Sequence, residues 1–236
     1  MIASKRPPIA FALDFAGVDE AREAARCVAP AIGMIKVGLE LFVHAGPPAV
    51  ALGKELGLPL FLDLKLHDIP ETVERAVGQA AKHGVRLVTV HASGGRTMLK
   101  RAVARAGGDL AICAVTILTS LDDADLRDIG LAGPASEAAV RLATMAFEAG
   151  VRWFVCSPAE VRALRSALGP DATLVTPGVR PASAAPGDQK RVATPEQAIA
   201  DGADWVVVGR PIRDASDPLG AARAIADAIA ATKVRS

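Results

Sequence analysis

Four ionisable side chains, Asp63, Lys65, His67 and Asp68, interrupt the otherwise apolar stretch FLDLKLHDIP at residues 61–70. If this stretch is a β-strand, side-chain alternation places Asp63, Lys65 and His67 on one face and the leucines on the other. The Asp63 and Lys65 side chains would then leave the strand about 6–7 Å apart. Burying such charges is costly unless they pair or take part in chemistry, so we interpret this stretch as the reaction centre.

Lys65 has the most informative surroundings of the four. Asp63 on the same face and Asp68 just beyond the strand favour its charged ammonium form. A lysine that stays protonated is a poor nucleophile, which argues against a Schiff base, but it can donate a proton to a strongly basic carbon. The alternative is a lysine that only forms a salt bridge.

Asp63 and Asp68 each allow a second interpretation. Asp63 could bind a metal ion, but Lys36 on a neighbouring strand and Lys65 would then lie close to the cation and repel it. We therefore expect a network of charged side chains that holds no metal. Asp68 could instead cap the helix predicted to begin at Pro70.

Two later segments have the composition of a phosphate site. The first is TPGVRP, which contains Pro177 and Arg180, and the second is VGRP, which contains Gly209 and Arg210. Glycine lets backbone N–H groups approach an anion, and arginine offers a fork of donors that matches phosphate oxygens. For Arg210 a salt bridge at the rim is the alternative.

The elements that must position these residues alternate along the chain between short strands and longer, alanine-rich helices. The expected strands cover residues 9–14, 33–38, 59–65, 85–91, 110–118, 151–156, 172–176 and 204–208. The expected helices cover residues 18–29, 39–56 with a break at 46–48, 70–83, 95–106, 136–149 with Ser136 as N-cap, 158–168, 195–201 and 217–231, with a short helix inside 119–133. Eight such pairs predict an α/β fold, a (β/α)8 TIM barrel that forms a single domain over residues 1–236. An open, doubly wound sheet is the alternative, because a sequence does not show closure.

In a (β/α)8 barrel the functional groups gather at the C-terminal ends of the strands. Polar residues fall at those predicted ends: Asp14, Lys36, Asp63 with Lys65, His91, Thr119, Ser157, Arg180 and Arg210. For the lone His91, a general base and a structural hydrogen-bonding residue are both open, whereas His67 is expected to be structural or exposed.

Composition excludes several classes of function. The net charge of +1 and the 3% of aromatic residues give no basis for binding nucleic acid. No apolar run approaches the roughly 20 residues of a membrane span, and the N-terminus has no apolar signal-peptide core. Cys113 and Cys156 lie in apolar runs and are expected to be buried thiols, which together with these absences predicts a cytoplasmic protein.

The motif FLDLKLHDIP occurs together with ALDFA, MIKVGLELF, VHASGG, ILTS, TPGVRP, GDQKR and VVGRPI, in the order of the family. This set, which runs from about Ile9 to the last helix, closely resembles the bacterial orotidine 5′-phosphate decarboxylases. The resemblance implies a homodimeric barrel enzyme that converts orotidine 5′-phosphate to UMP and CO2, the last step of UMP biosynthesis, without metal or cofactor.

The resemblance also implies roles for single residues. Lys65 resembles the lysine that protonates C6, Asp63 the acid that faces the substrate carboxylate, and Lys36 the lysine that completes the charge chain. Asp68 resembles the acid that reaches the neighbouring subunit's site. The implied substrate contacts are Asp14, Ile69, Thr72, Thr119, Ser120, Pro177, Arg180, Gln189, Gly209 and Arg210. Glu71 stands where related bacterial sequences more often have Asn.

Two other functions stay open at this level. One is a magnesium-dependent sugar-phosphate decarboxylase or aldolase on the same barrel, although such relatives carry an acid where this chain has Lys36. The other is a barrel that binds UMP without catalysing a reaction.

Overall fold

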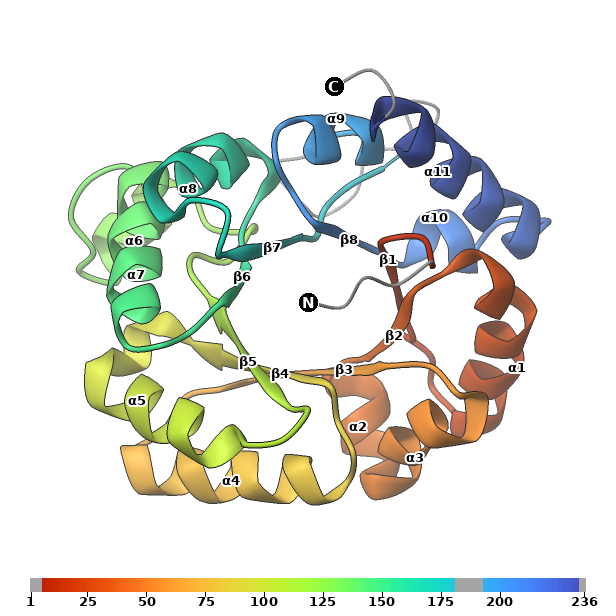
Figure 1. Cartoon of the computed structure of the whole chain (residues 1–236), viewed down its shortest axis with the longest axis horizontal. Coiled ribbons are helices and arrows are strands. Elements are labelled where there is room, and N and C mark those ends of the chain that lie inside the picture. The colour runs from red at the N-terminus through yellow and green to blue at the C-terminus, as the bar shows by residue number, and fades with distance from the viewer. Residues whose placement is uncertain (1–5, 181–192, 234–236) are drawn as a thin grey trace.

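The computed structural model describes residues 6–180 and 193–233, which form a closed barrel of eight parallel strands surrounded by helices (Figure 1). The strands are β1 (Ile9–Ala12), β2 (Met34–Val37), β3 (Leu60–Leu66), β4 (Leu87–His91), β5 (Ala111–Val115), β6 (Trp153–Val155), β7 (Thr173–Thr176) and β8 (Trp205–Val208). Each strand pairs with the next, and β1 pairs with β8 to close the ring. The predicted TIM barrel is confirmed, and the open sheet is excluded.

The helices lie outside the strand ring in Figure 1. They are α1 (Val18–Val28), α2 (Leu39–Ala45), α3 (Pro47–Leu56), α4 (Pro70–Lys82), α5 (Gly95–Ala106), α6 (Asp123–Asp128), α7 (Ala135–Glu148), α8 (Val161–Leu168), α9 (Pro195–Ala200), α10 (Arg210–Arg213) and α11 (Pro218–Lys233). The predicted break in the second helix falls at Gly46, whose φ of 59° suits glycine and separates α2 from α3.

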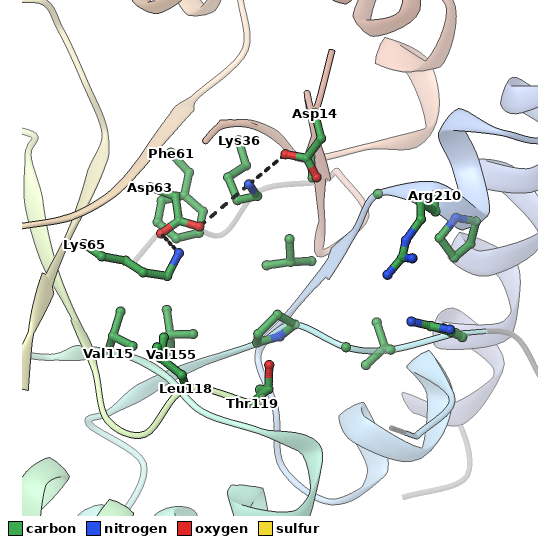
Figure 2. A pocket seen from close by; sticks show the side chains of 18 of the residues that line it. Asp14, Lys36, Phe61, Asp63, Lys65, Val115, Leu118, Thr119, Val155 and Arg210 are labelled. Carbon is green, nitrogen blue, oxygen red and sulfur yellow. Dashed lines mark hydrogen bonds and ion pairs between the residues drawn. The ribbon is translucent and has the colours of Figure 1, made fainter. Parts of the chain in front are cut away.

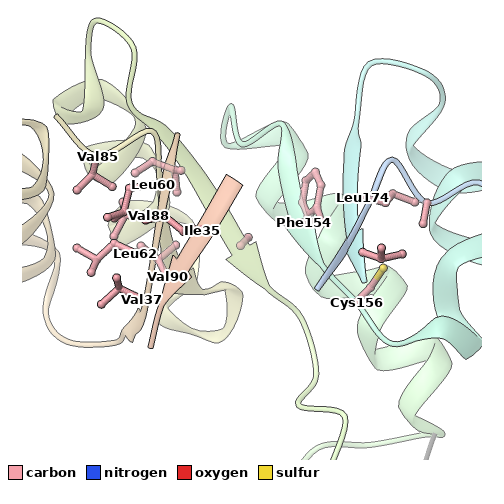
Figure 3. Close-up of a cluster of buried hydrophobic side chains, with 14 of the residues drawn as sticks. Ile35, Val37, Leu60, Leu62, Val85, Val88, Val90, Phe154, Cys156 and Leu174 are labelled. Atoms are coloured by element: carbon pink, nitrogen blue, oxygen red, sulfur yellow. The ribbon is translucent and has the colours of Figure 1, made fainter. Parts of the chain in front are cut away.

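Alternation along the strands divides the core into two layers. Outward-facing side chains such as Ile35, Leu62 and Val88 pack toward the helices (Figure 3). Inward-facing side chains fill the barrel itself with a smaller cluster: Ala10, Met34, Phe61, Leu87, Cys113, Val175 and Trp205. Because Lys36 and Asp63 each follow an inward-facing residue by two positions, they also point inward, toward the C-terminal mouth of the barrel.

Several predicted boundaries differ from the structure. The fifth strand ends at Val115 rather than at residue 118. The next residue, Thr116, still donates to the backbone oxygen of Val155, from its N–H at 3.3 Å and from its hydroxyl at 3.2 Å. Ser136 is not an N-cap, and that prediction is wrong. Helix α7 begins one residue earlier, and the Asp123 carboxylate accepts its first N–H, from Ala135, at 2.9 Å.

Gly33, just before β2, lies where the surrounding atoms leave no room for a side chain. A methyl group on its Cα would clash with the Pro7 carbonyl and lie 2.7 Å from the Trp205 ring. Gly33→Ala should therefore lower the free energy of unfolding by about 1–3 kcal/mol, measured by urea denaturation. Gly17→Ala is the matched control, since nothing lies within 4 Å of its added methyl. Equal stability of the two variants would contradict this packing argument.

Candidate active site

A row of alternating charges crosses the mouth of the barrel from β3 to β1 (Figure 2). Lys65 Nζ lies 2.9 Å from Asp63 Oδ1, and Lys36 Nζ lies 3.7 Å from Asp63 Oδ2. Lys36 Nζ also lies 3.4 Å from Oδ1 of Asp14, which follows β1. The three strands thus bring together four side chains that the sequence separates by up to about fifty positions, and all four line one pocket.

The Asp63 carboxylate keeps its negative charge despite its burial. Its side chain is only 14% exposed, and burial by itself would raise the pKa of Asp63. The charges of Lys36 and Lys65, with hydrogen bonds from Lys65 and from Thr89 on β4, outweigh burial and lower the pKa. The site therefore offers a fixed anion between two ammonium groups.

Lys65 has an unusual backbone. Its φ is 51°, in the left-handed region that costs a residue other than glycine roughly 1–2 kcal/mol. The pairing of β3 with β4 shifts register between Leu62 and Leu66, around this residue. Asp63 and Lys65 both line the pocket, and the alternating sequence pattern of β3 gives no sign of this local irregularity.

Asp14 is held from two sides. Gly38 leaves the space it needs, since a methyl group on Gly38 would lie 3.3 Å from Asp14 Oδ1 and 3.0 Å from Lys36 Nζ. Arg213 of α10 donates from Nη1 to the Asp14 backbone oxygen at 2.8 Å. The end of β1 is thereby tied to the helix that follows β8.

The pocket has a volume of about 240 Å³ and continues from the charge row to the loops after β7 and β8. Pro177, Arg180, Gly209 and Arg210 line it there, and Figure 2 shows Arg210 across the pocket from Lys65. Thr119, in the loop after β5, also lines the pocket. Apolar side chains also line the pocket, among them Val115, Leu118 and Val155. The pocket can therefore hold a ligand whose anionic end faces the arginines and whose reacting end faces the charge row.

Four predicted site residues lie outside this pocket. Asp68, Ile69, Thr72 and Ser120 are exposed, and Ile69 is 66% exposed despite its apolar side chain. The Asp68 carboxylate accepts a hydrogen bond from the adjacent Ile69 N–H at 2.6 Å but does not cap α4, whose N-cap is Ile69. A further predicted residue, Gln189, falls outside the described residues.

Glu71, the residue that departs from the family pattern, lies in the first turn of α4 and is exposed. Its carboxylate pairs with Arg75 one turn later in the same helix. Glu71 thus has an ion-pair partner, Arg75, within this chain.

Three other polar residues at strand ends do not line the pocket. The rings of His67 and His91 lie 5.3 Å apart between centroids, and burial, His67 and Lys65 together lower the pKa of His91, which leaves it neutral at pH 7. Ser157 is buried, and its backbone N–H donates to the buried Glu160 at 3.0 Å. His91 and Ser157 thus have local contacts and do not line the pocket.

Cys113 and Cys156 are buried free thiols, as expected, and burial raises the pKa of Cys156 to about 12. Cys27 is also free but exposed. Within residues 6–180 and 193–233, no three His, Cys, Asp or Glu side chains are grouped so that they could hold a metal ion. In the same ranges, no helix has the length and apolar character needed to cross a membrane.

A closed barrel with a charged pocket at the C-terminal ends of its strands defines an enzyme of the (β/α)8 class. The chain belongs to the orotidine 5′-phosphate decarboxylase / HUMPS family, whose family model matches residues 7–225. The family expected from the sequence motifs is thereby confirmed, as is the prediction of an enzyme.

Similar proteins cover nearly the whole chain. The orotidine 5′-phosphate decarboxylase of Anaeromyxobacter sp. (strain K) is 59% identical over 92% of this chain and 96% of its own. That of Thermobifida fusca is 53% identical over 93% of this chain and 94% of its own. The crystal structure of orotidine 5′-phosphate decarboxylase from Lactobacillus acidophilus superposes with a TM-score of 0.84 at 38% identity, covering 95% of this chain and 99% of that one.

The lowered pKa of Asp63 predicts how stability depends on pH. A folded-state pKa below the unfolded value of about 3.9 gives stabilisation that is complete above that value and is lost as pH falls through the folded pKa. The difference in free energy of unfolding between wild type and Asp63→Asn should therefore shrink below about pH 4. Urea denaturation at a series of pH values measures it.

Asp227→Asn provides the control, because this carboxylate is exposed on α11. Its free energy of unfolding should follow that of the wild type throughout the series. A wild-type advantage over Asp63→Asn that stays constant from neutral pH to pH 3 would contradict the assigned charge state.

Proposed function

We propose that this chain catalyses the decarboxylation of orotidine 5′-phosphate to UMP and CO2, the last step of UMP biosynthesis. The observation that carries the proposal is the Lys36–Asp63–Lys65 row at one end of a pocket that has Arg180 and Arg210 at its other end. Family membership and relatives named for this reaction at up to 59% identity support it.

The charge row suits the loss of CO2 from C6 of the pyrimidine. When the carboxylate leaves as CO2, the electron pair of the broken bond stays on C6, and the ring delocalises it poorly. The Lys65 ammonium stabilises this charge as it develops and then transfers its proton to C6, which leaves a neutral amine that water reprotonates. Asp63 faces the substrate carboxylate and, with Lys36, holds the ammonium in place.

The other end of the pocket binds the phosphate. Arg180 and Arg210 supply charged donors, Gly209 lets the backbone come close, and Pro177 borders the site. We assign Gln189 to the same group. Because the phosphate lies far from C6, its binding energy can be used to fix the reacting end and exclude water there.

The remaining contacts lie between these ends. Thr119, with Ser120 beside it, is assigned to the pyrimidine, and Asp14 to the ribose. Asp14 fits this role because it lines the pocket beside Lys36 and its position is fixed by Arg213.

We further propose that the reaction needs no metal ion and no cofactor. Asp63 already has an ammonium group on each side, so a cation bound there would meet two positive charges at short range. We also propose that residues 1–236 act as a single barrel domain, and that the enzyme works in the cytoplasm.

A homodimer would explain why some residues of the predicted site are exposed and lie outside the chain's own pocket. Asp68, Ile69 and Thr72 lie together at the start of α4 but outside the chain's own pocket. In the proposed dimer, Asp68 reaches the ribose in the neighbouring subunit's site, and Ile69 and Thr72 accompany it. The 66% exposed side chain of Ile69 would then lie against the partner.

Lys65→Ala should abolish decarboxylation, lowering kcat by about 10⁴-fold, because it removes the proton donor and the charge next to C6. UMP should still bind, since the phosphate end of the pocket is unchanged. The ultraviolet absorbance change that accompanies conversion of orotidine 5′-phosphate to UMP follows the reaction, with EDTA present throughout.

Lys100→Ala, which removes an exposed lysine from α5, is the control and should keep wild-type kcat. A wild-type protein that binds UMP yet leaves orotidine 5′-phosphate unchanged, or that loses turnover in EDTA, would overturn the proposed function or its metal-free form. An active Lys65→Ala protein would refute the role of Lys65.

Mixing inactive variants tests the dimer. If Asp68 acts in the partner's site, a hybrid of Lys65→Ala and Asp68→Ala subunits contains one native site, so an equal mixture should recover about a quarter of wild-type activity. Activity is measured after the two proteins are unfolded and refolded together.

In the matched control, Lys65→Ala is mixed with Asp63→Asn. Both changes damage the subunit's own site, so this mixture should stay inactive. Failure of the first mixture to recover activity would place Asp68 outside the neighbouring site.

A further inference from the structure

Thr89 on β4 has a hydroxyl group that makes two bonds inside the charge row. Its Oγ1 accepts the backbone N–H of Lys65 at 2.8 Å and donates to Asp63 Oδ1 at 3.0 Å. A threonine hydroxyl has one hydrogen, so both bonds form together only in this arrangement. One atom thus connects the backbone of Lys65 to the carboxylate that its ammonium contacts.

The bond to the Lys65 N–H lies where the strand is irregular. Lys65 has a φ of 51°, and the β3–β4 register shifts between Leu62 and Leu66. A buried backbone donor needs an acceptor, and at this position the side chain of Thr89 supplies one. A residue without a hydroxyl at position 89 would remove that acceptor and, with it, one constraint on the left-handed backbone.

Thr89 cannot touch a ligand in the pocket. It is fully buried and is not among the residues that line the cavity. On β4, Val88 and Val90 belong to the outer core layer, whereas Leu87 belongs to the cluster inside the barrel. Alternation therefore turns Thr89 into the barrel, beneath Asp63 and Lys65.

We propose that Thr89 is a positioning residue: its hydroxyl holds Lys65 in the left-handed conformation and orients Asp63, so that the ammonium stays directed at the reacting carbon. This inference rests on the proposed function. It assigns Thr89 an effect on the chemical step and none on the binding of the phosphate.

Thr89→Val removes the hydroxyl and keeps the shape of the side chain. Its kcat for orotidine 5′-phosphate should fall about 10–100-fold, while KM and the Kd of UMP change less than about 3-fold. Thr89→Ser keeps the hydroxyl and should stay within about 3-fold of wild type in kcat. Thr89→Ala provides the same comparison if the valine variant does not fold.

Thr116→Val is the matched control, because it also removes a buried hydroxyl, one that directly follows β5 and donates to the backbone oxygen of Val155. It should lower kcat less than about 3-fold. Equal losses in the Thr89→Val and Thr116→Val proteins would overturn the proposal, as would a serine variant as impaired as the valine variant.

Crystal structures separate this proposal from the proposed function. In Thr89→Val, Lys65 should leave the positive-φ region, and its Nζ should move beyond 3.5 Å from Asp63 Oδ1. An unchanged Lys65 would refute the role of Thr89 whether or not the wild-type protein decarboxylates orotidine 5′-phosphate. A wild-type protein without that activity would instead refute the proposed function.

Discussion

The burial of one carboxylate between two ammonium groups governs the arrangement of the site. Burial by itself would raise the pKa of Asp63, whereas Lys36 and Lys65 lower it, so removal of either lysine would leave the carboxylate poorly compensated. A charged group removed from water is held by its partners rather than by solvent, so its position is fixed before any substrate binds. The strand ends, Gly38 and the hydrogen bonds of Thr89 surround this carboxylate and its two lysine partners.

The architecture could be predicted from the sequence because the same local pattern of residues recurs in each strand–helix unit. Each unit shows a short apolar run followed by an amphipathic helix, and the polar residues fall at the C-terminal ends of the runs. The lining of the pocket by Asp14, Lys36, Asp63 and Lys65 follows from parallel strands, which bring their C-terminal ends to one side. The motifs were specific enough to indicate the family that the comparisons show.

The parts that could not be predicted arise from contacts between strands. The left-handed backbone of Lys65 has no signal in its own residue type, since a lysine normally avoids that region. The signal for Thr89 was present but weak: one hydroxyl in the apolar run LVTV, two residues before His91. Its two hydrogen bonds to β3 residues depend on the pairing of β4 with β3, which the sequence does not show. Ser136 was misassigned for a similar reason, because the group that caps α7 comes from α6.

The bond between Arg213 and the Asp14 carbonyl joins residues 199 positions apart, next to the seam where β8 closes on β1. During synthesis on the ribosome, the charge row comes from the first third of the chain, whereas α10 emerges almost last. The row therefore stays open to water while the five remaining strand–helix units, from β4 to β8, are made. Catalytic competence is thus a property of the finished ring, and a nascent or prematurely terminated chain would carry the charged residues without a site in which to use them.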